Sequence, residues 1–151
     1  MKVLAIVLTL CITGSLAFVH WIGAWGIVFP SHEYETTPPT LPAGLQAPAV
    51  LLVTKTNGFR HKEGIKAGVQ VIEALAQKND WTVFHTENGA VFNVDDLARF
   101  DVVMFLNTSG DILNDEQQLV FQNWLQAGGG WVGVHSAGDD SHKDWPWYME
   151  N

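Results

Sequence analysis

The stretch GGGWVGVHSAGD, residues 128–139, decides how this chain is expected to fold. Gly128 suits the left-handed backbone conformation that ends a helix. The tryptophan and valines that follow favour a short buried strand, and a turn of small residues then begins at His135. Such turns, at the carboxyl ends of strands, hold the ligand site in open α/β sheets. The stretch therefore predicts a helix, a strand and a pocket-forming turn that carries a histidine.

The same alternation of strand and helix extends over residues 49–151. The apolar run AVLLVT, residues 49–54, is typical of a strand that is buried on both faces. Further strands are expected at 81–85, 101–106 and 131–135, and helices at about 62–79, 93–100 and 114–127. Strands joined by helices form βαβ units with right-handed crossovers. The pattern therefore predicts an α/β domain with a doubly wound, flavodoxin-like parallel sheet of about four strands in the order 2-1-3-4.

An apolar segment precedes this domain. Residues 3–29 contain no Asp, Glu, Lys or Arg, and about 20 apolar residues are enough to cross a bilayer. We therefore interpret residues 1–29 as a transmembrane signal anchor. Lys2 places the N-terminus in the cytoplasm and the domain outside, in the periplasm or the extracellular space. The alternative is a secreted protein, released by cleavage after the sequence Ser15-Leu16-Ala17.

Residues 30–48 are rich in proline and threonine, which predicts an extended linker that holds the domain off the membrane. The formal net charge is −8, from 8 basic and 16 acidic residues. An acidic domain without a basic stripe is a poor candidate for binding nucleic acid. Cys11, the single cysteine, lies in the apolar segment, so the domain has no cysteine nucleophile and no internal disulfide.

Polar side chains follow each expected strand, and in a parallel sheet these loops converge at one edge. His135 can act there as a general acid or base, or it can bind a divalent metal ion with His61 and Asp139. The alternative for His135 is a partly buried, hydrogen-bonded structural residue. We expect the side chains that bind a ligand to be Lys55, Arg60, Asn107, Thr108, Asp111 and Ser136.

Purely structural roles are the alternatives for several of these residues. Arg60 can form a salt bridge with Glu63 or Glu87 instead of binding a ligand. The short polar side chains of residues 107–111 suit a sugar, but they also suit an ordinary turn. Trp145 and Trp147 are expected mainly in the core, near enough to the converging loops to cover them.

Four segments together resemble the trehalose-utilisation (ThuA-like) family of the class I glutamine-amidotransferase-like superfamily. They are residues 50–61 (VLLVTKTNGFRH), 101–114 (DVVMFLNTSGDILN), 128–139 and 144–148 (DWPWY). The resemblance implies a link to sugar or glycoside metabolism. True amidotransferases carry a cysteine in the turn after the strand that corresponds to residues 131–135, and this chain has His135 there. Hydrolysis of glutamine through a thiolate is therefore not expected. The family's domain normally continues past the DWPWY motif, so the chain is expected to hold only its N-terminal part.

Three functions follow from these observations. The first is a membrane-tethered, carbohydrate-related enzyme in which His135 is an acid–base catalyst or a metal ligand. The second is a non-catalytic module that binds a carbohydrate or a protein through the same edge. The third is an inactive, truncated fragment. The residues alone leave all three open.

Overall fold

Within residues 2–22 and 24–150, which the computed structural model describes, four parallel strands form one sheet in the order β2-β1-β3-β4. The strands are β1 (Ala49–Val53), β2 (Thr82–Thr86), β3 (Val102–Leu106) and β4 (Gly130–Val134). Central β1 pairs with β2 on one side and with β3 on the other, and all five of its residues are buried. The predicted α/β class and parallel sheet are confirmed.

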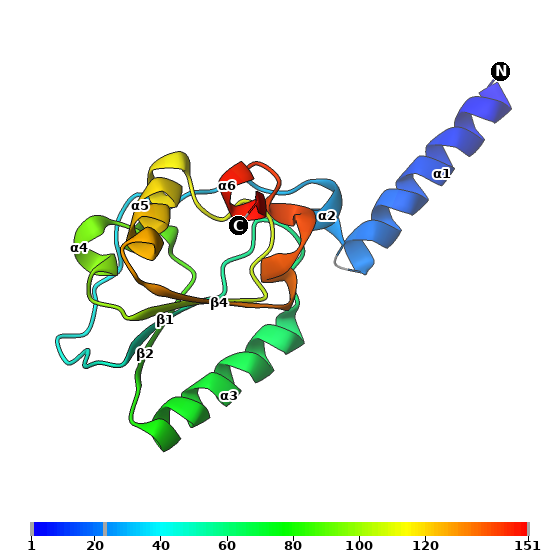
Figure 1. Cartoon of the computed structure of the whole chain (residues 1–151). Coiled ribbons are helices and arrows are strands. Elements are labelled where there is room, and N and C mark those ends of the chain that lie inside the picture. Colours follow the sequence, from blue (N-terminus) through cyan, green and yellow to red (C-terminus); the bar gives the residue numbers. More distant parts are fainter. Residues whose placement is uncertain (1, 23, 151) are drawn as a thin grey trace.

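Helices cover both faces of the sheet (Figure 1). Helix α3 (Lys62–Asn79) lies on one face, and α4 (Val94–Leu97), α5 (Asp115–Gln126) and α6 (Pro146–Glu150) lie on the other. Helix α5 begins with a capping box in which Asn114 and Gln117 bond to each other's backbone. The helix expected at 93–100 is shorter than predicted: Asn93 caps α4 as expected, but the helix ends at Leu97. A separate 3₁₀ turn, η1 (Gly89–Val91), which Asn88 caps, precedes it.

The main core lies between the sheet and α5. Leu51, Phe105 and Phe121 are at most 1% exposed. Trp145 is 3% exposed and packs against Phe121 with 5.7 Å between ring centroids, in agreement with its expected core role. Strand β4 lies at the sheet edge, where Val132 remains 41% exposed, because α3 packs over β2 and β3.

The apolar N-terminal segment forms two helices instead of one span to residue 29. Helix α1 (Lys2–Trp21) projects away from the domain (Figure 1) and buries none of its residues. It is long and apolar enough to cross a membrane or to act as a signal sequence. Helix α2 (Trp25–Val28) follows it and lies against the domain, where Gly26 meets the backbone of Gly58.

The linker packs onto the domain and does not stand away from it as a free stalk. Lys55 Nζ donates to the Glu33 carbonyl at 2.7 Å and to Glu35 Oε2 at 2.5 Å. Leu41 and Leu45 pack against the main core. The linker therefore forms part of the folded unit.

Candidate functional site

The loops after β1, β3 and β4 meet in a cleft of about 540 Å³, which we call the histidine cleft. These three strands are neighbours and parallel, so their carboxyl ends lie at the same edge. Its wall also includes part of the N-terminal segment. The lining residues are Gly26, Ile27, Pro30, Gly58, Phe59, His61, Ser109, Gly110, Ser136, Asp139, Asp140, Ser141 and Lys143.

Two histidines lie in contact at this edge. His61 precedes α3, and His135 begins the 3₁₀ turn η2 (His135–Gly138) directly after β4. Their ring centroids are 4.6 Å apart, with the rings tilted by 64°. His61 lines the cleft, whereas His135 is exposed, is not among the lining residues and lies beside the cleft in contact with the His61 ring. The edge of the sheet thus brings together two residues that are 74 positions apart by their numbers (135 − 61).

The backbone at this edge is unusual. His135 has φ 58° and Asn107, which follows the adjacent strand β3, has φ 53°. Residues other than glycine rarely occupy this left-handed region, and such residues concentrate at functional sites. The conformation also ends β4 at Val134, one residue before the predicted end. The sharp turn directs the chain at His135 out of the sheet and into η2.

Three buried polar atoms near the cleft have no hydrogen-bond partner in the described part of the chain: Ser136 Oγ, Thr108 Oγ1 and Asp111 Oδ1. Their residues are 3%, 0% and 7% exposed. Nearly all buried polar groups in proteins are hydrogen-bonded, so an exception requires an explanation. Of the three, Ser136 lines the cleft itself.

Other polar groups of the cleft are fixed by the fold. Ser141 Oγ accepts a hydrogen bond from the Gly110 amide at 2.9 Å, and the Ser141 amide donates to Asp139 Oδ1 at 2.9 Å. Nε2 of buried His142 donates to the Ser136 carbonyl at 3.2 Å, and burial lowers the pKa of His142. Burial raises the pKa of Asp111, and the Asp144 carboxylate raises it further.

Two of the expected ligand-binding side chains are engaged elsewhere. Lys55 is 5% exposed and pairs with Glu35 of the linker. Arg60 pairs with Glu87 and donates to the Thr54 carbonyl at 3.0 Å, which is the salt-bridge alternative. Trp145 and Trp147 do not line the histidine cleft.

The expected metal set is not assembled. Within the described residues, no group of three or more His, Cys, Asp or Glu side chains is placed to hold a metal ion. His61 and Asp139 both line the cleft, and His135 contacts only the former by a ring contact.

Sequence reasoning missed the contribution of the N-terminal segment to the cleft. Gly26, Ile27 and Pro30 all line it, but Gly26 and Ile27 were assigned to the membrane span and Pro30 to the extended linker. Ser141 was also missed, although it follows Asp139-Asp140 in a short polar run after the last strand.

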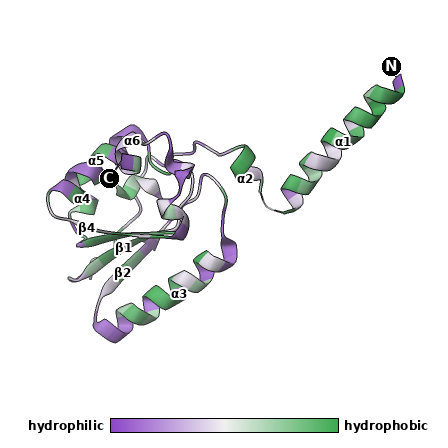
Figure 2. Ribbon diagram, turned by 45° about the vertical axis from the view of Figure 1, so that its right-hand side comes forward, coloured by the Kyte–Doolittle hydropathy of each residue, from purple (hydrophilic) through white to green (hydrophobic). Residues whose placement is uncertain are grey.

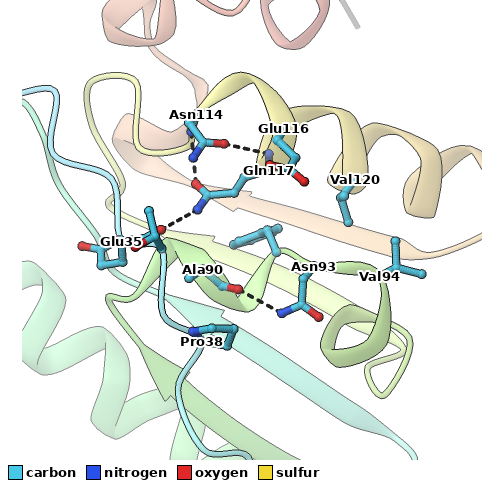
Figure 3. A pocket seen from close by; sticks show the side chains of 11 residues that line it. Glu35, Pro38, Ala90, Asn93, Val94, Asn114, Glu116, Gln117 and Val120 are labelled. Carbon is cyan, nitrogen blue, oxygen red and sulfur yellow. Dashed lines mark hydrogen bonds between the residues drawn. The ribbon is translucent and has the colours of Figure 1, made fainter.

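A second pocket of about 240 Å³ lies where the linker crosses α5 and η1, and we call it the linker seam (Figure 3). Its polar groups are paired: Gln117 Nε2 donates to the Glu35 carbonyl at 2.8 Å, and Asn93 Nδ2 donates to the Ala90 carbonyl at 2.9 Å. Partial burial opposes ionisation of Glu35, but hydrogen bonds from Lys55 and the Gly89 amide lower its pKa. The seam therefore serves as a joint between linker and domain.

Comparison with known proteins relates the domain to one family. A family model described as ThuA, trehalose utilisation, matches residues 49–150. A solved ThuA-like protein from Bacteroides uniformis ATCC 8492 has a similar fold, with a TM-score of 0.57 and 22% sequence identity. The likeness covers 76% of this chain and 46% of that protein, so this chain spans less than half of its length. A search of curated proteins gave no match.

Proposed function

Because the chain belongs to the ThuA family over residues 49–150, we propose that it is a membrane-tethered domain that binds a small carbohydrate in the histidine cleft and acts on it there. The contact between His61 and His135, with ring centroids 4.6 Å apart, carries the proposal. Imidazole is the side chain best suited to acid–base chemistry near neutral pH. The family's description, trehalose utilisation, supports a sugar as the ligand class.

The chemistry we propose is proton transfer during glycoside hydrolysis. One imidazole of the contacting pair donates a proton to the glycosidic oxygen as the bond between that oxygen and the anomeric carbon breaks. Water then bonds to the anomeric carbon, and the proton that it releases returns to the same imidazole, while the other imidazole holds the first in place by their ring contact. Ser136 is a buried residue whose Oγ has no hydrogen-bond partner in the part of the chain that the structure describes, and this Oγ is available to bind a sugar hydroxyl.

Turnover measurements on the full chain test this role. The substrates are trehalose and a panel of nitrophenyl glycosides, and the variants are His135→Ala and, as a matched control, His32→Ala in the exposed part of the linker. Loss of a general acid or base lowers the rate by about 10²–10⁴. We expect a loss of at least about 100-fold for His135→Ala and no change for His32→Ala. Equal rates in both variants would remove His135 from the mechanism.

A non-catalytic binding module is the second candidate. Serine hydroxyls contribute much of the polar lining of the cleft, through Ser109, Ser136 and Ser141, and such groups bind sugars without reacting. This candidate is favoured if a sugar binds saturably without turnover and if His135→Ala binds it with the same affinity. Neither binding nor turnover by a folded protein is the result that selects an inactive fragment.

For location, we propose that α1 stays in the membrane, with the N-terminus in the cytoplasm and the domain in the periplasm or outside the cell. The support is a helix of 20 residues that buries none of its side chains against the domain and Lys2 at its start. Cell fractionation with N-terminal sequencing checks the anchor, and protease added to spheroplasts checks the side. A soluble product that begins at Phe18 is the outcome that favours secretion instead.

A further inference from the structure

The two walls of the histidine cleft differ in chemistry. Ser109, Ser136 and Ser141 come from the sheet edge and carry hydroxyls, and the charged side chains of Asp139, Asp140 and Lys143 line the cleft with them. In contrast, Ile27 and Pro30, with Phe59 beside them, form an apolar wall. We infer that the ligand is a membrane-borne glycolipid, with its sugar at the hydroxyl wall and its alkyl chain along α2. The inference rests on the proposed function and names the substrate class of the same cleft.

The apolar wall is built into the fold. At Gly26, an added Cβ would lie 2.2 Å from the Gly58 carbonyl oxygen, so α2 approaches the loop after β1 as closely as glycine allows. The Ser31 amide donates to the Asn57 carbonyl at 2.7 Å, and Ser31 Oγ donates to Asn57 Oδ1 at 3.1 Å. Backbone packing at one end and hydrogen bonds at the other therefore hold Ile27 at the cleft.

The apolar wall also continues directly into the candidate membrane span. Helix α2 begins at Trp25, a few residues after α1 ends at Trp21, and both are hydrophobic along most of their length (Figure 2). Ile27 is 65% exposed and Phe29 is 53% exposed. With α1 in a bilayer, this short connection keeps the cleft near the membrane surface. An apolar path thus leads from the bilayer to the hydroxyl groups of the cleft.

The measurable consequence is that the affinity for an alkyl glucoside should rise with the length of its alkyl group. Each methylene removed from water strengthens binding by about fourfold when it is fully buried. The wall buries only part of a chain, so we expect octyl β-D-glucoside to bind at least about tenfold more tightly than methyl β-D-glucoside. This gain in affinity from the longer alkyl group should depend on the side chain at position 27.

The experiment uses the full chain in phosphatidylcholine nanodiscs, with calorimetric titration of both glucosides and subtraction of empty nanodiscs. The variant is Ile27→Ser, and the matched control is Val28→Ser, on the same short helix but outside the cleft lining. Both side chains are more than half exposed, so neither substitution disturbs the core. We expect Ile27→Ser to reduce the octyl-to-methyl ratio to about threefold or less and Val28→Ser to leave it unchanged.

The outcomes separate this inference from the proposed function. Equal binding of the two glucosides overturns the glycolipid but leaves carbohydrate binding in place. A preference for octyl glucoside that survives Ile27→Ser also overturns it, because the chain then lies elsewhere. Binding of neither glucoside counts against both proposals.

A second part of the experiment tests whether the ligand comes from the membrane. Monoglucosyl diacylglycerol in the same nanodisc should displace octyl glucoside from the wild-type chain. Failure to displace it assigns the cleft to soluble amphiphiles and overturns the membrane-borne ligand.

Discussion

The linker seam and the histidine cleft both hold polar side chains in hollows at the surface of the same domain, but the two differ in how many of these polar groups are hydrogen-bonded. In the seam, Glu35 accepts hydrogen bonds from Lys55 and the Gly89 amide. In and beside the cleft, Ser136 and Thr108 keep buried hydroxyls without a described partner. A hydrogen-bonded group contributes stability, whereas an unpaired buried group costs stability until something binds it. The seam thus fixes the structure, and the cleft retains binding capacity.

The largest effect in this comparison is expected from Lys55→Met, which removes the ion-pair partner of Glu35 in the seam. The substitution removes a buried ammonium and leaves the Glu35 carboxylate, which is 37% exposed, without its ion-pair partner. Fully buried pairs cost more to break than exposed ones, so for this half-buried pair we expect a loss of about 2 kcal/mol in the free energy of unfolding. Urea unfolding followed by tryptophan fluorescence measures it.

The control for Lys55→Met is Lys66→Met, on the exposed surface of α3. We expect that control to change stability by less than about 0.5 kcal/mol. Equal effects of the two substitutions are the result that contradicts a structural role for the seam.

Asp111→Asn tests a carboxylate beside the cleft whose Oδ2 accepts the Asp144 amide and whose Oδ1 has no described hydrogen-bond partner. Burial and the Asp144 charge raise the pKa of Asp111 above its ordinary value of 3.8. The folded state therefore binds the proton more tightly than the unfolded state, and the stability from this group is lost as the pH rises through its folded pKa. At pH 7 we expect Asp111→Asn to stabilise the protein by about 1 kcal/mol.

The pH dependence provides the check on that interpretation. Below the ordinary pKa of 3.8, Asp111 is protonated in both states, so the advantage of Asp111→Asn should disappear in acid. Thermal unfolding at neutral and acid pH measures the difference, with the exposed Asp80→Asn as control. An advantage that is equal at both pH values excludes the carboxylate charge as its cause.

The smallest effect on stability is expected from Ser136→Ala, within the cleft. Its hydroxyl has no described partner, so its removal should leave stability unchanged or raise it by up to about 1 kcal/mol. Sugar affinity should fall by about tenfold, the value of one hydrogen bond. Ser141→Ala is the matched contrast, because its hydroxyl accepts the Gly110 amide at 2.9 Å, and its loss should cost about 1 kcal/mol. A reversed order of stability between these two variants breaks the distinction between paired and unpaired groups.

The fold could be predicted because its signals are local. The apolar run of β1 and the capping pair Asn114 and Gln117 each show an element over a few residues. Right-handed crossovers then restrict how the strands can be ordered, and the order 2-1-3-4 is the one observed. The proximity of His61 and His135 follows from the same rule, since both residues come after strands of one parallel sheet.

The pairing of polar groups could not be predicted from such signals. Arg60 had two acidic candidates, Glu63 and Glu87, and only the folded chain brings the latter within reach. Lys55 follows a strand, as a ligand-binding residue would, but its ammonium turns toward the linker. The apolar residues around Gly26 indicated a membrane span, and nothing in them indicated contact with Gly58.

The amino-acid sequence by itself determined the elements, their order in the sheet and the edge at which polar loops converge. These features depend on hydrophobic periodicity and on residues near one another in the chain. Only the tertiary structure decided which polar groups are satisfied. The Gln117 side chain bonds to Glu35 across 82 positions, and the buried Ser136 hydroxyl finds no partner among residues 2–22 and 24–150. Such pairings depend on three-dimensional distance, which is fixed only when the sheet, the linker and α2 have packed together.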